Sequence, residues 1–276
     1  EPVCEHFGVC GGCKWQHMKY DAQLIFKQKE VTENLKRIGK LDLPELKPIL
    51  AVENPYWYRN KMEFSFSNQR WLTKEEVDSG IEINQNALGF HKPGMWDKIV
   101  DVDKCHLQAD PSNAIRNFVR SYANKNELTF FDPKNQVGFL RSLMIRTTST
   151  DEVMIVLQIF HKEDAILFPL LDTVATEFPN LTSIQYVING KANDTIYDQE
   201  IVCYKGQDFI TEVMEDLQFK ITAKSFYQTN SLQAYELYKV VRELADLKGD
   251  ELVYDLYTGT GTIAQFVAQN ALKVVG

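Results

Sequence analysis

The sequence lacks any long hydrophobic run, and no stretch approaches the roughly 18–20 consecutive apolar residues that a membrane-spanning helix needs. The N-terminal residues also lack the basic-then-apolar pattern of a secretory signal. These absences predict a cytoplasmic protein that makes no contact with a membrane. Positive charge is not in excess either, because 30 Lys and Arg residues face 38 Asp and Glu residues, for a net charge of −8. Taken alone, that average argues against a nucleic-acid binder, whose binding domain is usually basic.

The charge is distributed unevenly along the chain. Residues 1–150 hold 21 basic and 19 acidic side chains, whereas residues 151–276 hold 9 and 19. The first half is therefore slightly positive, and the negative average comes from the second half. This distribution predicts a localised basic face opposed by an acidic surface, so nucleic-acid binding stays open.

Cysteine is scarce, and its placement is informative. The chain has 5 cysteines, an odd number, and three of them fall within ten residues. This pattern fits a metal or cluster site in a reducing compartment better than a disulfide framework. Cys4, Cys10 and Cys13, with Cys105 far downstream, offer four thiolates, which suit either an iron–sulfur cluster or tetrahedral zinc. For Cys203 a small buried side chain on a strand is the simpler interpretation.

The first 210 residues predict a loop, a helix and a β-rich region. The Gly-rich segment 1–19 has no periodicity and is expected to be a loop. A helix should follow to about residue 39, with Asp21 as its N-cap and Gly39 as its stop. Strands are expected at 63–67, 87–91, 97–103, 140–147, 153–160 and 183–188, with 68–86 as a loop. Helices are expected from the Asp110 N-cap to about 125, and at 164–177 with an interruption or a kink at Pro169.

The last 66 residues change character. Residues 218–230 should be extended and lead into a helix with Asn230 as N-cap, Gln233 as a capping-box partner and Gly249 as its stop. Residues 251–276 then predict a strand, a glycine turn, a helix and the start of a second strand, which is how a doubly wound α/β domain begins. Because a buried parallel sheet needs several strands, we expect these residues to be part of a longer protein.

Two C-terminal segments carry candidate ligand contacts. In VYDLYTGTGT, Gly259 and Gly261 allow the backbone to approach a ligand closely, and Asp255 ends a strand at the edge where α/β folds bind ligands. In SFYQTN, Phe226, Gln228 and Asn230 alternate along one face. Helix capping alone explains Asn230, whereas Gln228 has no such local reason.

Basic and aromatic residues interleave in two further segments. They are YWYRNKMEF, with Arg59 and Lys61, and FLRSLMIR, with Arg141 and Arg146. Phosphate contacts beside rings for stacking are what RNA binding requires.

Together, these segments resemble the RNA 5-methyluridine methyltransferases, and specifically the iron–sulfur members that act on 23S ribosomal RNA. The resemblance spans almost the whole chain. It is carried, in order, by CEHFGVCGGCKWQH, YRNKMEF, GFHKPGMWDKIVDVDKCHL, GFLRSLMIR, SFYQTN and DLYTGTGT.

The resemblance implies two cofactors and the residues that hold them. It implies a [4Fe–4S] cluster on Cys4, Cys10, Cys13 and Cys105, and contacts of Gln228 and Tyr257 with S-adenosylmethionine (AdoMet). The expected AdoMet site is completed by Asp255, Gly259, Gly261 and Thr262, although relatives usually carry Asn at the last position. The expected RNA contacts are Arg59, Lys61, Arg141 and Arg146.

The resemblance also implies the reaction. A cysteine thiolate adds to C6 of uracil, C5 takes the methyl group from AdoMet, and a base removes the C5 proton. In relatives that cysteine and base lie beyond the glycine turn, so these 276 residues are expected to transfer no methyl group. The expected partner is 23S ribosomal RNA, bound by a monomer. A transfer-RNA 5-methyluridine enzyme and a non-catalytic RNA-binding module stapled by a cluster or zinc remain alternatives.

The expected fold is mixed α+β and α/β. A cluster loop (1–19) comes first, followed by a helical segment (20–51) that the resemblance places against the methyltransferase part. A β-rich RNA-binding domain (52–210) then supplies Cys105. Residues 211–276 are expected to form the incomplete start of a Rossmann-like AdoMet-dependent methyltransferase domain.

Overall fold

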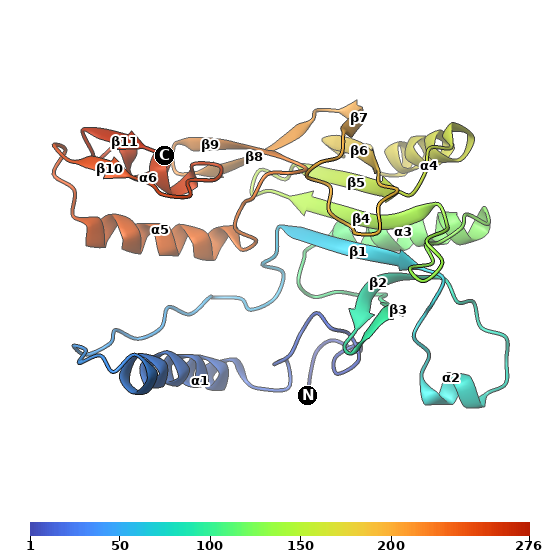
Figure 1. Ribbon diagram of the computed structural model, residues 1–276, viewed down its shortest axis with the longest axis horizontal. Coiled ribbons are helices and arrows are strands. Elements are labelled where there is room, and N and C mark those ends of the chain that lie inside the picture. Colours follow the sequence, from blue (N-terminus) through green and yellow to red (C-terminus); the bar gives the residue numbers. More distant parts are fainter.

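The structure, a computed structural model, describes residues 1–276 and is built around one seven-stranded mixed sheet (Figure 1). The strand order is β3-β2-β1-β4-β5-β6-β7. The strands are β1 (Lys61–Ser67), β2 (Ala87–Lys92), β3 (Met95–Asp101), β4 (Leu140–Thr147), β5 (Val153–Ile159), β6 (Ser183–Ile188) and β7 (Ile201–Gly206). Neighbouring strands are antiparallel except β5 and β6, which run parallel and are connected through helix α4 (Asp164–Glu177).

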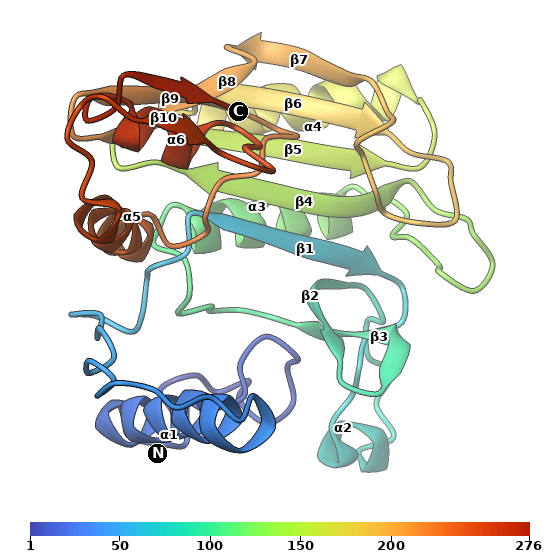
Figure 2. The ribbon, with the colours of Figure 1, turned by 60° about the vertical axis from the view of Figure 1, so that its left-hand side comes forward.

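Two helices cover one face of this sheet. Helix α3 (Ser112–Lys125) and helix α4 lie behind the strands in Figure 2. Leu143 and Ile145 of β4 share a buried core with Ile115 of α3 and Leu170 of α4. The larger hydrophobic core of the protein therefore lies between the sheet and these two helices.

C-terminal elements cover the opposite face. They are the hairpin of β8 (Phe209–Met214) and β9 (Leu217–Thr222), helix α5 (Ser231–Ala245), and a parallel unit of β10 (Leu252–Tyr254), α6 (Thr262–Ala268) and β11 (Lys273–Val275). Met144 and Met154 of the sheet share a second core with Ile210 of β8 and Phe266 of α6. Strand β5 is buried along its whole length. Because successive strand residues point to opposite faces, this burial on both faces fits a sequence that is apolar except for Gln158.

Helix α1 (Tyr20–Glu33) lies apart from the sheet (Figure 1) and buries none of its residues. A π-helical turn at Asn34–Ile38 continues it. The extended segment that follows contacts α5, where Gln233 Nε2 donates to the Leu50 carbonyl (3.3 Å) and Lys47 pairs with Glu243 (3.9 Å). Polar contacts therefore connect residues 20–51 with the C-terminal elements.

Most of the predicted strands are confirmed. The strands predicted at 140–147 and 183–188 match β4 and β6, and the other predicted strands end within two residues of the observed ones. The structure adds β8 and a short helix, α2 (Lys74–Asp78), inside the predicted loop 68–86. Thr73 and Glu76 form a capping box at the start of α2, a signal present in the sequence but missed.

Several predicted helix ends are wrong. Asp21 lies in the first turn of α1 and does not cap it. The helical stretch does end at Ile38, next to Gly39 as predicted, but the glycine is right-handed with φ −69°. The side chain of Asp110 does not cap α3, which begins after Pro111. Helix α5 ends at Ala245, before Gly249, and α4 runs through Pro169 without interruption. None of these helices combines the length and apolar character needed to cross a membrane.

Candidate cluster, cofactor and RNA sites

The four cysteines predicted to bind a metal or cluster converge on one small cavity. Cys4, Cys10, Cys13 and Cys105 all line a space of about 20 Å³, although Cys105 lies 92 residues beyond Cys13 in the sequence. All four are free thiols. The structure therefore brings together the complete predicted ligand set.

The N-terminal loop is held against the sheet by backbone hydrogen bonds. The Gly11 N–H donates to the His91 carbonyl of β2 (3.2 Å), and the Cys4 N–H donates to Gln16 Oε1 (3.2 Å). The Gly12 N–H donates to Cys10 Sγ (3.3 Å), a contact that stabilises a thiolate. Burial raises the pKa of Cys10 to about 11 and also raises the pKa of Cys105. Without a bound cation these thiols are protonated at neutral pH, so binding a metal or cluster releases protons.

Helix α3 holds the downstream cysteine in place. Asn113 Oδ1 accepts the Cys105 N–H (2.8 Å), and Asn113 Nδ2 donates to the Cys105 carbonyl (3.1 Å). One turn later, Arg116 Nη2 donates to the Asp103 carbonyl (2.6 Å), and Arg120 pairs with Asp101 and Asp103. The sequence carried no signal for these contacts, because each joins a helix side chain to an irregular loop.

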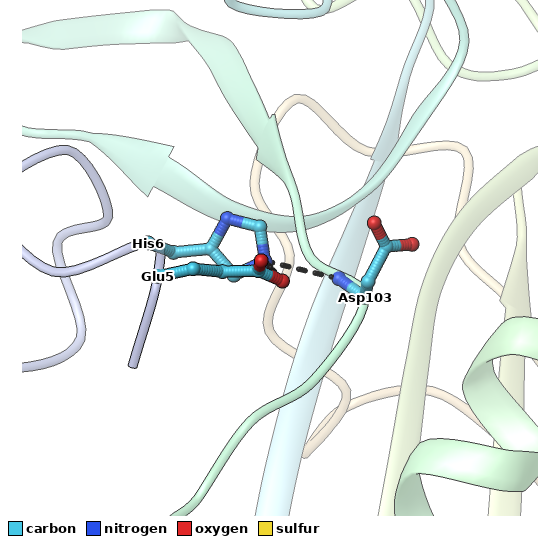
Figure 3. A group of neighbouring side chains, drawn as sticks. All are labelled: Glu5, His6 and Asp103. Carbon is cyan, nitrogen blue, oxygen red and sulfur yellow. Dashed lines mark hydrogen bonds and ion pairs between the residues drawn. The ribbon is translucent and has the colours of Figure 1, made fainter. Parts of the chain in front are cut away.

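A second group of potential ligands lies beside the cavity. Glu5, His6 and Asp103 have donor atoms within 4.8 Å of one another. Figure 3 shows that His6 Nε2 already accepts the Asp103 N–H (3.2 Å), and the Asp103 carboxylate pairs with Arg120. This group therefore joins the N-terminal loop to the segment that carries Cys105.

The glycine turn is ordered by its aspartate. The Asp255 carboxylate accepts hydrogen bonds from Thr258 Oγ1 (3.0 Å) and from the Ala264 N–H (3.1 Å). Gly259 and Gly261 have φ of 58° and 73°, a left-handed conformation that favours glycine. A side chain added at Gly259 would meet only the Tyr257 carbonyl at 3.9 Å, so the backbone there is open to a ligand.

The SFYQTN segment lies beside this turn. Thr260 Oγ1 donates to the Phe226 carbonyl (3.0 Å), and Asn60 Nδ2 donates to the Gln228 carbonyl (2.8 Å). The side chains of Phe226 and Gln228 are exposed, with Tyr227 buried between them. Gln228 therefore remains available to a ligand, on a segment that is hydrogen-bonded to the turn carrying the fully exposed Tyr257.

Two other residues of this region have structural contacts. Thr262 is buried, and its hydroxyl lies 3.0 Å from that of Tyr238. Asn230 caps α5 as predicted by accepting the Gln233 N–H (3.0 Å). The reciprocal half of the predicted capping box is wrong, because the Gln233 amide instead donates to Leu50.

The four basic residues assigned to RNA divide into two pairs. Arg59 and Lys61 are half-buried, whereas Arg141 and Arg146 are 3% and 4% exposed. Arg141 donates to the Asn189 and Lys191 carbonyls and pairs with Asp194, and Arg146 donates to the Ala223 and Ser225 carbonyls. These two guanidinium groups bind the protein's own loops, which leaves Arg59 and Lys61 as candidate contacts.

A basic and aromatic cleft that sequence analysis missed adjoins the cysteines. It has a volume of about 480 Å³, and its lining includes Trp15, Tyr56, Tyr58, Lys14 and Lys27. Lys27 Nζ lies 5.4 Å from the centre of the Trp15 ring. The signal was the same interleaving of basic and aromatic residues that was recognised at Arg59, here in the CKWQHMKY segment.

The prediction for Cys203 is wrong. Its side chain is exposed on β7, an edge strand of the sheet, with Sγ 3.8 Å from the Lys205 carbonyl. The apolar sequence of the strand suggested burial, but an edge position leaves part of it open to solvent.

Known proteins resemble this chain over its full length. An uncharacterized RNA methyltransferase of Porphyromonas gingivalis is 55% identical over 282 residues, covering 100% of this chain and 60% of that protein. Another, of Bacteroides thetaiotaomicron, is 53% identical over 279 residues, covering 100% and 62%. The chain therefore spans about three fifths of the length of these curated relatives. No family model matches it.

A solved structure shows the same fold. The tRNA (uracil-54, C5)-methyltransferase of Pyrococcus abyssi, in complex with S-adenosyl-L-homocysteine, superposes with a TM-score of 0.69 at 28% sequence identity. The match covers 95% of this chain and 57% of that one. The mixed α/β fold described above is thus that of a methyltransferase over nearly the whole chain.

Proposed function

We propose that this chain is the cluster-bearing, RNA-binding and cofactor-binding part of an AdoMet-dependent methyltransferase that places a methyl group on C5 of a uridine in RNA. The observation that carries the proposal is the Thr260–Phe226 hydrogen bond, which sets the segment of Gln228 beside the glycine turn of Tyr257. Full-length similarity to proteins named RNA methyltransferases supports it.

The proposed AdoMet site combines an open backbone turn with exposed side chains. Gly259 and Gly261 give the ligand access to the backbone, Asp255 orders the turn, and Gln228 and Tyr257 offer polar and aromatic contacts. Thr262 supports this site from within the core, because its buried hydroxyl lies against that of Tyr238 and does not face a ligand. The solved relative bound to S-adenosyl-L-homocysteine supports a ligand of this class.

The proposed chemistry is addition of a cysteine thiolate to C6 of uracil, methyl transfer from AdoMet to C5, and removal of the C5 proton by a base. Neither nucleophile nor base is assigned to these residues. Because its C5 carbon is a weak nucleophile, uracil needs this temporary covalent adduct before it can accept the methyl group.

The proposed cluster is [4Fe–4S] on Cys4, Cys10, Cys13 and Cys105. A single tetrahedral zinc ion, with Zn–S bonds of about 2.3 Å, requires sulfur atoms about 3.8 Å apart. No three of the four cysteine sulfurs lie within 4.8 Å of one another, since the group that does is Glu5, His6 and Asp103. A four-iron core holds its thiolates farther apart than a single zinc ion does, which supports the cluster, and its role when bound is to fix the N-terminal loop.

The proposed substrate is 23S ribosomal RNA, with transfer RNA as the second candidate. The cluster cysteines support the first, and the solved relative, a transfer-RNA enzyme by name, favours the second. RNA would contact Arg59, Lys61 and the cleft of Trp15, Lys14 and Lys27. In the proposed domain division, 1–19 form the cluster loop, 52–210 the RNA-binding domain and 211–276 part of the methyltransferase domain, with 20–51 held beside α5.

The test is to incubate the full-length protein with AdoMet and unmodified 23S RNA or transfer RNA, and to quantify 5-methyluridine by mass spectrometry. We expect methylation of one RNA class by the full-length protein and none by residues 1–276. No 5-methyluridine in either RNA would overturn the proposed activity. Iron and sulfide analysis of anaerobically purified protein tests the cluster separately, with Cys10→Ser expected to lose both and Cys203→Ser to keep them.

A further inference from the structure

Arg116 of helix α3 is a fully buried cation without an acidic partner. Its side chain is 0% exposed, and no carboxylate lies within ion-pair distance of it. Nη2 donates to the Asp103 carbonyl (2.6 Å), and the guanidinium lies 4.9 Å from the centre of the Phe64 ring. Nε and Nη1 have no hydrogen-bond partner. An uncompensated buried charge of this kind is strongly unfavourable, so the arrangement requires an explanation.

The nearby carboxylates are already paired. Arg120, one turn further along α3, binds Asp101 at 2.8 Å and Asp103 at 2.5 Å. Asn117 also approaches Arg116, but its amide oxygen (3.3 Å) brings no charge. The protein's own acidic residues therefore do not neutralise Arg116 directly.

The four-cysteine site becomes a source of negative charge once a metal or cluster is bound, because its thiols must then be thiolates. Asn113, one helical turn before Arg116, holds both backbone polar groups of Cys105. Arg116 itself holds the carbonyl of Asp103, two residues before Cys105. The guanidinium thus lies beside the segment that carries the fourth thiolate. Four thiolates around a doubly charged centre, whether [4Fe–4S]²⁺ or Zn²⁺, leave two negative charges there.

We propose that Arg116 is the built-in counter-charge of the four-cysteine centre, a positioning residue that stabilises the thiolate-bound form through its buried positive charge. The inference rests on the proposed four-cysteine site but not on which metal fills it. A buried cation is costly in the metal-free chain and favourable once the anionic centre has formed. Arg116 therefore couples binding of the metal or cluster to the folding of the segment that carries Asp103 and Cys105.

The experiment compares Arg116→Met, Arg116→Lys and Arg141→Met with the wild-type protein, each metal-free and after anaerobic iron–sulfide reconstitution or zinc loading. Methionine removes the charge and keeps an apolar stem, and lysine keeps a charge. Arg141 is the matched control, because it is also buried and stacked on an aromatic ring, at 4.3 Å from Phe131, but binds Asp194.

We expect Arg116→Met to leave the thermal stability of the metal-free protein unchanged or higher. In the loaded protein it should shift the one-electron reduction of the cluster about tenfold toward the oxidised form, which corresponds to about 59 mV. Zinc affinity, measured by chelator competition, should fall by a similar factor. Arg116→Lys should retain most of the wild-type reduction potential and zinc affinity. Arg141→Met should destabilise the metal-free and the loaded protein alike without changing the reduction potential.

Each contrary result is distinct. A wild-type protein that takes up neither iron nor zinc overturns the four-cysteine site and the inference with it. Normal loading with an unchanged potential and zinc affinity in Arg116→Met overturns the inference alone. A metal-free Arg116→Met protein that fails to fold shows a structural role instead, and also overturns it.

Discussion

Replacing Asn113 with alanine should destabilise the protein far more than its position on a helix surface suggests. The Asn113 amide is 8% exposed and makes two hydrogen bonds with the backbone of Cys105, one as acceptor (2.8 Å) and one as donor (3.1 Å). Alanine would leave the Cys105 N–H and carbonyl buried without partners.

The magnitude follows from those two orphaned groups. A buried polar group that loses its partner costs about 1–3 kcal/mol, so the two groups orphaned in Asn113→Ala should together cost about 2–6 kcal/mol of the free energy of unfolding. Because folded domains are stable by only about 5–15 kcal/mol, this loss is a large share of the total. The segment that carries Cys105 should also loosen, which would speed the loss of a bound cluster to a chelator.

Urea unfolding of the metal-free protein measures the first effect, and Asn117→Ala is the control. Asn117 lies one turn further along the same helix and donates to the Asp103 carbonyl (3.0 Å) through a bond that is exposed, so water can replace it. Its amide oxygen also accepts from Arg116 (3.3 Å) and Arg120 (3.4 Å), but both guanidinium atoms keep a second, shorter bond to Asp103. The control should lose less than about 1 kcal/mol. If the two variants unfold with free energies within about 0.5 kcal/mol of each other, the reasoning from buried orphaned groups is wrong.

Three further predictions concern acid stability, the domain contact and the glycine turn. Burial alone would raise the pKa of Asp132, but hydrogen bonds from Asn135, Asn68 and Lys134 hold it below its usual value. The stabilisation by the Asp132 carboxylate is therefore present above about pH 3.9 and lost as the pH falls through the lowered pKa. Urea unfolding should show Asp132→Asn to be less stable than the wild type at pH 7. If the difference in free energy of unfolding between the two proteins does not become smaller at pH 3, this reasoning is wrong. Glu212, 1% exposed, accepts from Ser149 and from the Ser231 hydroxyl (2.9 Å). Glu212→Ala should lower the free energy of unfolding by about 2–3 kcal/mol, because it removes the link between Ser149 and Ser231. If it lowers the melting temperature no more than the exposed control Glu236→Ala does, this link does not stabilise the contact between the domains. Gly261→Ala, at φ 73°, should cost about 1–2 kcal/mol and weaken S-adenosyl-L-homocysteine binding by calorimetry, whereas Gly190→Ala should not.

Strands β4, β5 and β6 could be predicted because their apolar runs fit burial on both faces, and β1 because its apolar and polar residues alternate. The ends of the helices could not. Gly39 has the residue type of a left-handed stop, but the chain passes into a π-helical turn in which the glycine stays right-handed. The left-handed residue is instead Lys40, with φ 52°, and the Leu41 N–H donates to the Leu35 carbonyl (3.2 Å), so the stop is made one residue later than the glycine predicts.

The candidate sites show the same division. Cys4, Cys10, Cys13 and Cys105 could be grouped from residue type and spacing, because few other roles suit four thiols. Arg141 could not be placed correctly, because its partners, Asn189, Lys191 and Asp194, lie 48–53 residues away in a loop with no sequence signal. An arginine in a strand suggests a surface contact until the loop that covers it is known.

The distribution of charge around two of the clefts refines where RNA would bind. Arg59 lines a cleft of about 650 Å³ together with Asp151, Glu152 and Glu177, so acidic side chains there oppose a phosphate backbone. In the cleft beside the cysteines, Lys14 and Lys27 have no acidic partner, and Trp15 is 43% exposed for stacking. Positive charge and exposed rings therefore coincide at the cysteine loop, on which both Lys14 and Trp15 lie. An N-terminal loop fixed by a cluster would hold these side chains in place, which explains how a centre with no electron to transfer could still serve RNA binding.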